Sequence, residues 1–89
     1  MLSSAQRKEL KARAHKLEPV VLVGAKGITD EVVNEVDRAL KAHELIKVRA
    51  PTLERDAREE AMQTLCARTG AQSVQTIGKV LVIYRKRDE

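Results

Sequence analysis

The chain has 89 residues, of which 43% are hydrophobic and 34% charged, and its formal net charge is +4. This composition predicts a single folded domain with a modest core and little room for a deep substrate cavity, and it excludes a disordered chain. No apolar run approaches the roughly 18 residues that a membrane span needs, and the first residues lack the apolar segment of a secretory signal. We therefore expect a cytoplasmic protein that does not enter a membrane.

The positive charge is concentrated at the start of the chain. Residues 1–16 hold five basic residues and one acidic residue, whereas the remaining residues hold twelve of each. Clustered positive charge attracts polyanions such as nucleic acids by long-range electrostatics. The alternative, which the sequence leaves open, is a helix face that is charged only for solubility.

The first predicted element is a helix that ends before Glu18–Pro19, because proline disfavours helical geometry in the residue before it. Ser3 and Gln6 match a capping box at its start. Its apolar stripe has helical spacing and consists of Leu10, Ala14 and Leu17. Four consecutive aliphatic residues, 20–23, then predict a strand that is buried on both faces.

A second helix and a second strand follow the glycine-rich segment 24–27. Thr29 can cap the helix with its hydroxyl, and the negative charges of Asp30 and Glu31 complement the helix dipole. The apolar stripe of this helix consists of Val33, Val36 and Leu40. Residues 45–50 show the largely alternating pattern of a strand with one wet face.

The last third of the chain predicts a third helix and a hairpin. The apolar stripe of the helix consists of Ala57, Ala61 and Leu65, and Gly70 is its natural C-cap. Two short strands, 74–77 and 80–84, flank Gly78–Lys79, which fits a type II′ turn. Residues 85–89 are expected to form a flexible tail.

The predicted order is α-β-α-β-α-β-β within one α/β domain, residues 1–89. Helices that alternate with strands imply parallel crossovers, and the last two strands must be antiparallel. The expected fold is therefore a four-stranded mixed sheet packed with three helices.

The segment Gly24-Ala25-Lys26-Gly27 is the main functional candidate. Two glycines three residues apart allow a tight turn with accessible N–H groups, the following helix N-terminus carries partial positive charge, and Lys26 adds a full charge. Such a loop can hold a nucleic-acid backbone, although Asp30 and Glu31 would repel a phosphate. The chain has neither GxxxxGK[ST] nor GxGxxG, which argues against a nucleotide-binding loop. A tight connection without a ligand is the alternative.

The stretch PVVLVGAKGITDEVVNEVDRALKAHELIKV, residues 19–48, closely resembles the CRM domain, the chloroplast RNA splicing and ribosome maturation family. The later GKVLVIYR, residues 78–85, resembles the closing strand of that family. The specific part is the combination of the GxxG loop, the ITD-type helix start, AL-x-x-HELIKV and the final IGKVLVIYR. A lone domain of this length is similar to the bacterial YhbY-like RNA-binding proteins.

This resemblance implies a fold similar to the C-terminal domain of bacterial translation initiation factor 3. It implies that the GxxG loop contacts RNA, as the corresponding loop of KH domains does, and that the protein associates with the precursor of the large ribosomal subunit. By position, the loop role falls to Gly24, Ala25, Lys26 and Gly27. The clustered positive charge adds Arg7, Lys8 and Lys11 of the first helix as candidate RNA contacts, although the sequence does not establish that they lie next to the loop.

Other basic residues have two interpretations. Lys47 and Arg49 project from one face of their strand, where a wet edge is favoured over an RNA contact. Residues 85–87 are either an arm that reaches phosphates or a solvated tail. Tyr84 is the only aromatic residue, and we expect it to pack at a strand edge. Without aromatic stacking platforms, RNA must be bound through its backbone and shape.

Catalysis, cofactors and metals are not expected. His15 and His43 have no partners at metal-ligand spacing, and Cys66 lies on the apolar side of its helix without an orienting carboxylate or an oxyanion site. We expect a non-catalytic RNA-binding protein with no metal, no cofactor and no small-molecule substrate. The alternative is a protein-interaction module that docks on the ribosome or on another assembly factor without touching RNA.

Overall fold

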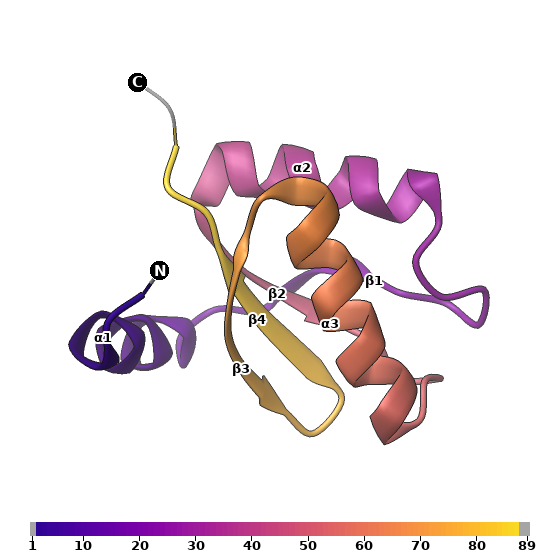
Figure 1. The fold of residues 1–89 in the computed structure, drawn as a ribbon, viewed down its shortest axis with the longest axis horizontal. Coiled ribbons are helices and arrows are strands. Elements are labelled where there is room, and N and C mark those ends of the chain that lie inside the picture. The colour runs from indigo at the N-terminus through magenta and orange to yellow at the C-terminus, as the bar shows by residue number, and fades with distance from the viewer. Residues whose placement is uncertain (1, 88–89) are drawn as a thin grey trace.

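The computed structural model describes residues 2–87. Its elements follow the expected order α-β-α-β-α-β-β (Figure 1). The elements are α1 (Ser4–Ala14), β1 (Pro19–Leu22), α2 (Asp30–His43), β2 (Leu45–Arg49), α3 (Arg55–Thr69), β3 (Gln72–Ile77) and β4 (Val80–Tyr84). The predicted four-stranded mixed sheet with three helices is confirmed. Within the described residues, no helix has the length and apolar character needed to cross a bilayer.

The sheet has the strand order β1-β2-β4-β3. The crossover through α2 makes β1 and β2 parallel, whereas β4 runs antiparallel to both of its neighbours, β2 and β3. The sheet therefore has β1 and β3 as its edges. Figure 1 shows α2 and α3 together on one side of the sheet and α1 apart from them.

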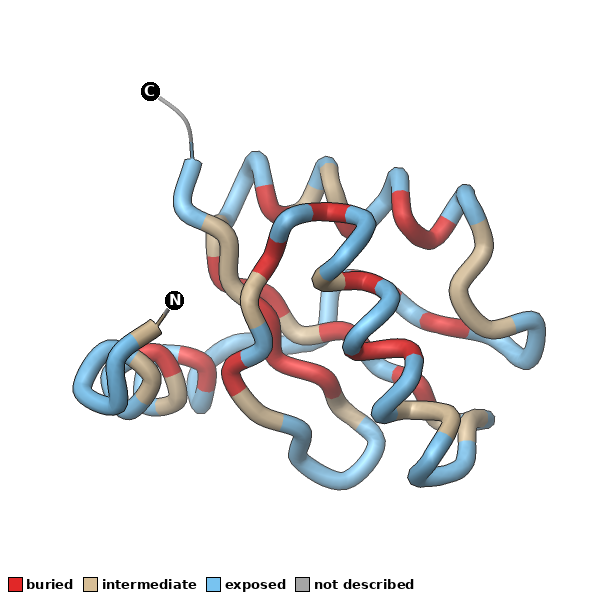
Figure 2. The backbone as a smooth tube through the Cα atoms, viewed as in Figure 1, coloured by how far each residue is buried: buried red, intermediate tan, exposed pale blue. Residues whose placement is uncertain are grey.

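Hydrophobic packing on the two faces of the sheet forms two clusters. The larger cluster joins α2 and α3 to the sheet, with Leu40, Ile46 and Leu65 fully buried at its centre. The smaller cluster joins α1 to the other face and consists of Leu10, Ala14, Leu45, Val74 and Val82. Because side chains alternate along a strand, neighbouring residues of β2 serve opposite clusters, and Figure 2 shows the buried residues concentrated between the layers.

The strand β1 corrects one expectation. Its aliphatic run predicted burial on both faces, but 51% of Val20 and 61% of Leu22 is exposed, while Val21 is buried. The physical reason is that β1 is an edge strand, and α1 packs against β2, β3 and β4 instead of covering it. The aliphatic run thus predicted a strand correctly, but it did not predict which face of that strand is buried by a helix.

The end of α1 corrects a second expectation. The helix stops at Ala14, well before Pro19, and the Leu17 N–H donates to the Ala14 carbonyl at 3.0 Å as the chain turns. Leu17 therefore leaves the predicted stripe and is 37% exposed. Proline limits how far a helix can extend, but it does not fix where the helix ends.

Capping residues and turns confirm the local predictions. The Ser3 hydroxyl accepts from the Gln6 N–H at 3.1 Å, and the Gln6 side chain accepts from the Ser3 N–H at 2.8 Å, which completes the capping box. Gly70 ends α3 with φ +76°. Gly78 has φ +56° and Lys79 has a negative φ, as a type II′ turn requires. These signals are local, and each needs only a few neighbouring residues.

Candidate nucleic-acid interface

The segment Gly24-Ala25-Lys26-Gly27 forms an exposed β-turn that follows the buried Val23. Its start is fixed by the Val23 N–H, which donates to the Arg49 carbonyl at 2.8 Å and extends the pairing of β1 with β2. The turn closes where the Gly27 N–H donates to the Gly24 carbonyl at 3.0 Å. Ala25 and Lys26 lie at its exposed tip.

The two glycines of this turn differ in what the fold requires. Gly27 has φ +76°, in the left-handed region that favours glycine. Gly24 has no positive φ, and a Cβ built there meets nothing within 4 Å. The fold therefore requires glycine at position 27 but not at position 24. At Gly24 the missing side chain leaves the backbone open to close approach by another molecule.

The N-terminus of α2 lies directly after the turn. The Thr29 hydroxyl accepts from the Val32 N–H at 3.2 Å and so caps the helix, as predicted. Asp30, which raised the question of phosphate repulsion, is paired with Arg68 of α3 at 2.9 Å. Arg68 offsets the negative charge of Asp30 at this end of α2, whereas Glu31 stays exposed without an ion pair among the described residues.

Arg7 of α1 holds the helix onto the sheet. Its Nη1 donates to the Ser73 carbonyl at 2.6 Å and to the Val74 carbonyl at 3.4 Å. These carbonyls lie where the register between β3 and β4 shifts, between Ser73 and Gln75. Because a bulge disrupts the regular ladder, Arg7 supplies a donor at the irregular point. Sequence reasoning missed this role, because the partners are 66 and 67 positions apart.

Lys8 and Lys11 lie beside Arg7 on the same helix. Together with Ser4 and Arg7 they line a shallow depression of about 350 Å³. Lys8 is exposed and Lys11 is half-buried, and neither has an ion pair within the described residues. Both positive charges are therefore available to a ligand.

The turn and α1 do not form one continuous surface. In Figure 1, which is drawn with the longest axis horizontal, α1 lies at the left end and the β1–α2 turn at the right end. The molecule measures 33 × 27 × 22 Å along its principal axes. The sequence had left the contiguity of these two basic regions open, and the structure places them at opposite ends.

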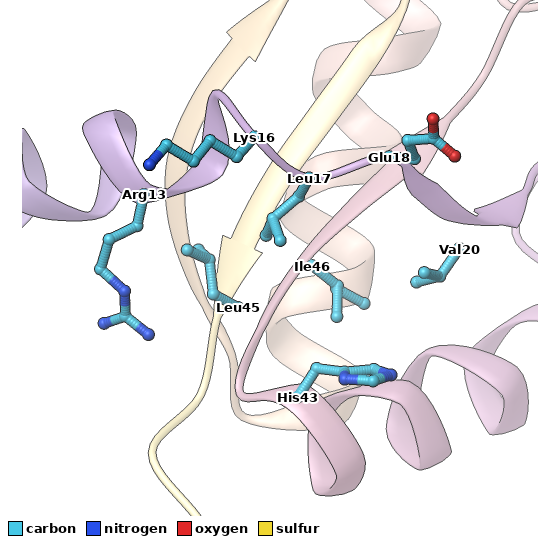
Figure 3. A pocket seen from close by; sticks show the side chains of 8 residues that line it. All are labelled: Arg13, Lys16, Leu17, Glu18, Val20, His43, Leu45 and Ile46. Atoms are coloured by element: carbon cyan, nitrogen blue, oxygen red, sulfur yellow. The ribbon is translucent and has the colours of Figure 1, made fainter.

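A mainly apolar cavity of about 360 Å³ lies between the end of α1, the start of β1 and the end of α2. Figure 3 shows Leu17, Leu45 and Ile46 at its centre, with Arg13 and Lys16 on the side of α1 and His43 on the side of α2. The outward-turned Leu17 contributes to this lining instead of to the core.

Two of the three C-terminal cations, Arg85 and Arg87, contact acidic side chains, whereas Lys86 has no ion pair among the described residues. Arg85 donates through Nη1 to Asp37 Oδ1 at 2.7 Å and to the Thr69 carbonyl at 2.7 Å. The Arg87 N–H donates to Glu44 Oε2 at 2.8 Å. The sequence left open whether residue 85 belongs to a free arm or to a solvated tail, and these contacts of Arg85 fit neither alternative. Residues 88 and 89 of the expected tail lie outside the described range, and its flexibility stays a prediction.

The remaining candidates are Cys66 and Tyr84. Cys66 is half-buried, and burial raises the pKa of its thiol above the usual value. Tyr84 packs against the α1 cluster, which confirms a packing role, but β4 lies between β2 and β3 and is not an edge strand of the sheet. No three His, Cys, Asp or Glu side chains come together among residues 2–87 as a metal site would require.

Comparisons with known proteins cover nearly the whole chain. A family model described as the CRS1 / YhbY (CRM) domain matches residues 2–85. A Haemophilus influenzae protein named "RNA-binding protein" is 42% identical over 88 residues, which cover 99% of this chain and 89% of that protein. A Pseudomonas aeruginosa protein whose name begins "Probable RNA-binding protein" is 44% identical over 85 residues, 96% of this chain and 82% of that protein.

A solved structure supports the same relationship. The solution structure of a protein from Staphylococcus aureus matches with a TM-score of 0.88 at 35% sequence identity. The match covers 100% of this chain and 93% of that chain. The similarity therefore extends over the complete fold described above.

Proposed function

We propose that this chain, which belongs to the CRS1 / YhbY (CRM) domain family, binds RNA through the turn Gly24-Ala25-Lys26-Gly27 without catalysing a reaction. The observation that carries the proposal is Gly24, an exposed glycine that neither the backbone conformation nor the packing of the fold requires. A ligand backbone that approaches closely gives a physical reason for glycine there. The names of the relatives from Haemophilus influenzae and Pseudomonas aeruginosa support RNA as that ligand.

The turn would hold the RNA backbone by electrostatics and hydrogen bonds. Lys26 is exposed at the tip, and the N-terminus of α2 adds the partial positive charge of a helix end. Arg68 offsets Asp30, which reduces the repulsion that a phosphate would meet. The turn therefore favours phosphate contacts, which position RNA without reading its sequence.

The proposed RNA is structured ribosomal RNA of the large-subunit precursor, bound in the cytoplasm during ribosome assembly. This assignment follows from the family resemblance. The chain has one Tyr, no Phe and no Trp, so stacking platforms contribute little. Lys8 and Lys11 would form a second contact region at the opposite end, together with the Arg7 N–H groups that do not bind the Ser73 and Val74 carbonyls.

Binding to protein-free RNA separates this proposal from its rival. We expect the purified protein to bind purified large-subunit ribosomal RNA in a filter-binding titration at low salt. A protein-interaction module that docks on a ribosomal protein or an assembly factor would co-sediment with ribosomal particles but would not bind the naked RNA. Co-sedimentation without RNA binding would therefore contradict the proposal and favour the module.

The identity of the RNA is tested in cells. Crosslinking followed by sequencing of the bound RNA should concentrate reads in precursor and large-subunit ribosomal RNA. Reads spread evenly over unrelated transcripts would contradict the role in ribosome assembly, even if the RNA-binding activity itself were confirmed.

A further inference from the structure

One transverse row of side chains crosses the sheet at the end nearest the turn. The strand register pairs Leu22 of β1 with Arg49 of β2, Arg49 with Val80 of β4, and Val80 with Ile77 of β3. Paired residues of neighbouring strands project to the same face of a sheet. These four side chains, Leu22, Arg49, Val80 and Ile77, form what we call the open row.

The open row lies on the face that carries α1, but α1 does not cover it. Lys47, two residues before Arg49 on the same strand, pairs with Val82, which is buried in the α1 cluster. The α1 cluster includes Val82 but none of the four side chains of the open row. Leu22 is 61% exposed, Ile77 is 47% exposed, Arg49 is exposed and Val80 is half-buried.

The row is continuous with the proposed RNA-binding turn. Leu22 is the last residue of β1. The next residue, Val23, donates its N–H to the Arg49 carbonyl, and Gly24 then begins the turn. On the other side the β3–β4 hairpin is fixed to the end of β2, because the Ala50 N–H donates to the Lys79 carbonyl at 2.8 Å. A groove of about 480 Å³ runs along β1 at this place and includes Leu22 and Arg49 in its lining, with Glu18 at its far end.

The open row itself is positively charged through Arg49, and the acidic Glu18 lies at the far end of the adjoining groove. No acidic residue belongs to the open row, and neither Arg49 nor Lys47 has an ion pair among the described residues. Lys79 adds a cation at the hairpin. An exposed face that combines unpaired cations with aliphatic side chains fits a polyanion that also offers apolar surface. A second copy of this chain would bring like charges together.

We propose that an unpaired stretch of the bound RNA lies across the open row, with Arg49 as its main charged contact; this proposal rests on the RNA binding proposed above. A duplex presents mainly phosphates and 2′-hydroxyls to a flat protein surface, so aliphatic side chains gain little from it. An unpaired nucleotide also presents the face of its base and its ribose, against which Leu22 and Ile77 can bury their exposed area. The turn would then hold the backbone at one end of this stretch.

Two RNA probes and two sets of variants test the proposal. The probes are a fluorescently labelled hairpin with an unpaired oligouridine loop and a blunt duplex built from the same stem. Arg49→Gln should weaken hairpin binding about tenfold, since a charge-assisted contact is lost. The matched control is Arg38→Gln, which removes the same charge from an exposed position in α2 that has no ion pair among the described residues, and it should change affinity less than about twofold.

The apolar part of the row is tested by Leu22→Thr combined with Ile77→Thr. Threonine keeps the strand preference, so the fold should be retained, which circular dichroism checks. Binding of the hairpin should fall about fivefold while binding of the duplex stays unchanged. Equal loss for hairpin and duplex, or no loss for either, would overturn the assignment to an unpaired stretch.

The outcomes separate this proposal from the proposed function. If Gly24→Ala weakens RNA binding while Arg49→Gln behaves like Arg38→Gln, the turn binds RNA and the open row does not. If the unaltered protein binds neither probe nor ribosomal RNA, both proposals fail. Only weaker hairpin binding by the Arg49 and Leu22/Ile77 variants, with the turn intact, supports the open row.

Discussion

The two glycines of the turn have different structural roles. Gly24 and Gly27 occupy the two ends of the GxxG motif, but only Gly27 has a positive φ. Asp37 and Arg85 gave no pattern at all, because the pair that they form joins residues 48 positions apart. The sequence could predict that the turn exists, whereas the distinct role of each residue required the backbone conformation and the tertiary contacts.

We predict that Gly27→Ala lowers the free energy of unfolding by about 1–2 kcal/mol, because alanine is strained at φ +76°. Gly24→Ala, the matched control three residues away, should change it by no more than about 0.5 kcal/mol. Urea denaturation of both variants measures the difference. Equal losses for the two variants would show that the backbone of the turn is not as described.

Asp37 should make stability depend on pH in the acid range. Hydrogen bonds from Arg85 and Lys41 hold the pKa of the Asp37 carboxyl below its ordinary value of 3.8. Since the pKa is lower in the folded state, this stabilisation is fully present above the unfolded-state pKa and is lost as the pH falls through the folded-state pKa. We therefore expect the stability gap between the unaltered protein and Asp37→Asn to be largest near neutral pH and to shrink below about pH 4.

The control for this prediction is Glu35→Gln, an exposed carboxylate of the same helix without an ion pair among the described residues. Thermal denaturation between acid and neutral pH measures all three proteins. A stability gap for Asp37→Asn that does not change with pH would contradict the assigned ion pair.

At the scale of the elements, local signals predicted the helices and strands, whereas long-range contacts determine which of their faces are buried and how they pack together. The capping box, Thr29 and Gly70 each depend on neighbours within a turn of helix, and all three were predicted correctly. The burial of β1 was predicted wrongly, because its position at the sheet edge depends on strand order. The way α1 is held depends on Arg7, whose partners lie in β3.

We predict that Arg7→Ala destabilises the protein by about 1 kcal/mol, because the hydrogen bonds from its guanidinium to two carbonyls at the irregular point of β3 are lost. Lys8→Ala, the neighbouring exposed cation, should cost less than about 0.5 kcal/mol. Chemical denaturation compares the two variants. Equal stability of the two variants would contradict the structural role of Arg7. Its guanidinium would then be free to bind RNA, like the side chains of Lys8 and Lys11.

At the scale of the whole molecule, two basic regions lie at opposite ends of the longest axis. The sequence placed the entire positive excess on residues 1–16, but it could not show that α1 and the glycine turn lie at opposite ends (Figure 1). That distance follows from the route of the chain, in which α1 covers the face near the start of β2 while the turn follows the end of β1. The open row and Lys47 occupy part of the face between them.

RNA binding should therefore depend steeply on salt. Each neutralised phosphate contributes about −0.7 to −0.9 to the slope of log affinity against log salt. Lys8→Gln combined with Lys11→Gln should make the slope shallower by about 1.4–1.8 if both lysines contact phosphates. Filter binding over a salt series measures the slope. An unchanged slope would confine the interface to the end of the molecule that carries the turn.

The central claim is that the turn Gly24-Ala25-Lys26-Gly27 contacts RNA, and the most direct test combines two measurements on Gly24→Ala. Its melting temperature should match that of the unaltered protein, because a Cβ at position 24 meets nothing within 4 Å. Its affinity for large-subunit ribosomal RNA should fall at least about tenfold, because the same Cβ blocks the approach of the RNA backbone. Unchanged affinity at unchanged melting temperature would contradict the account.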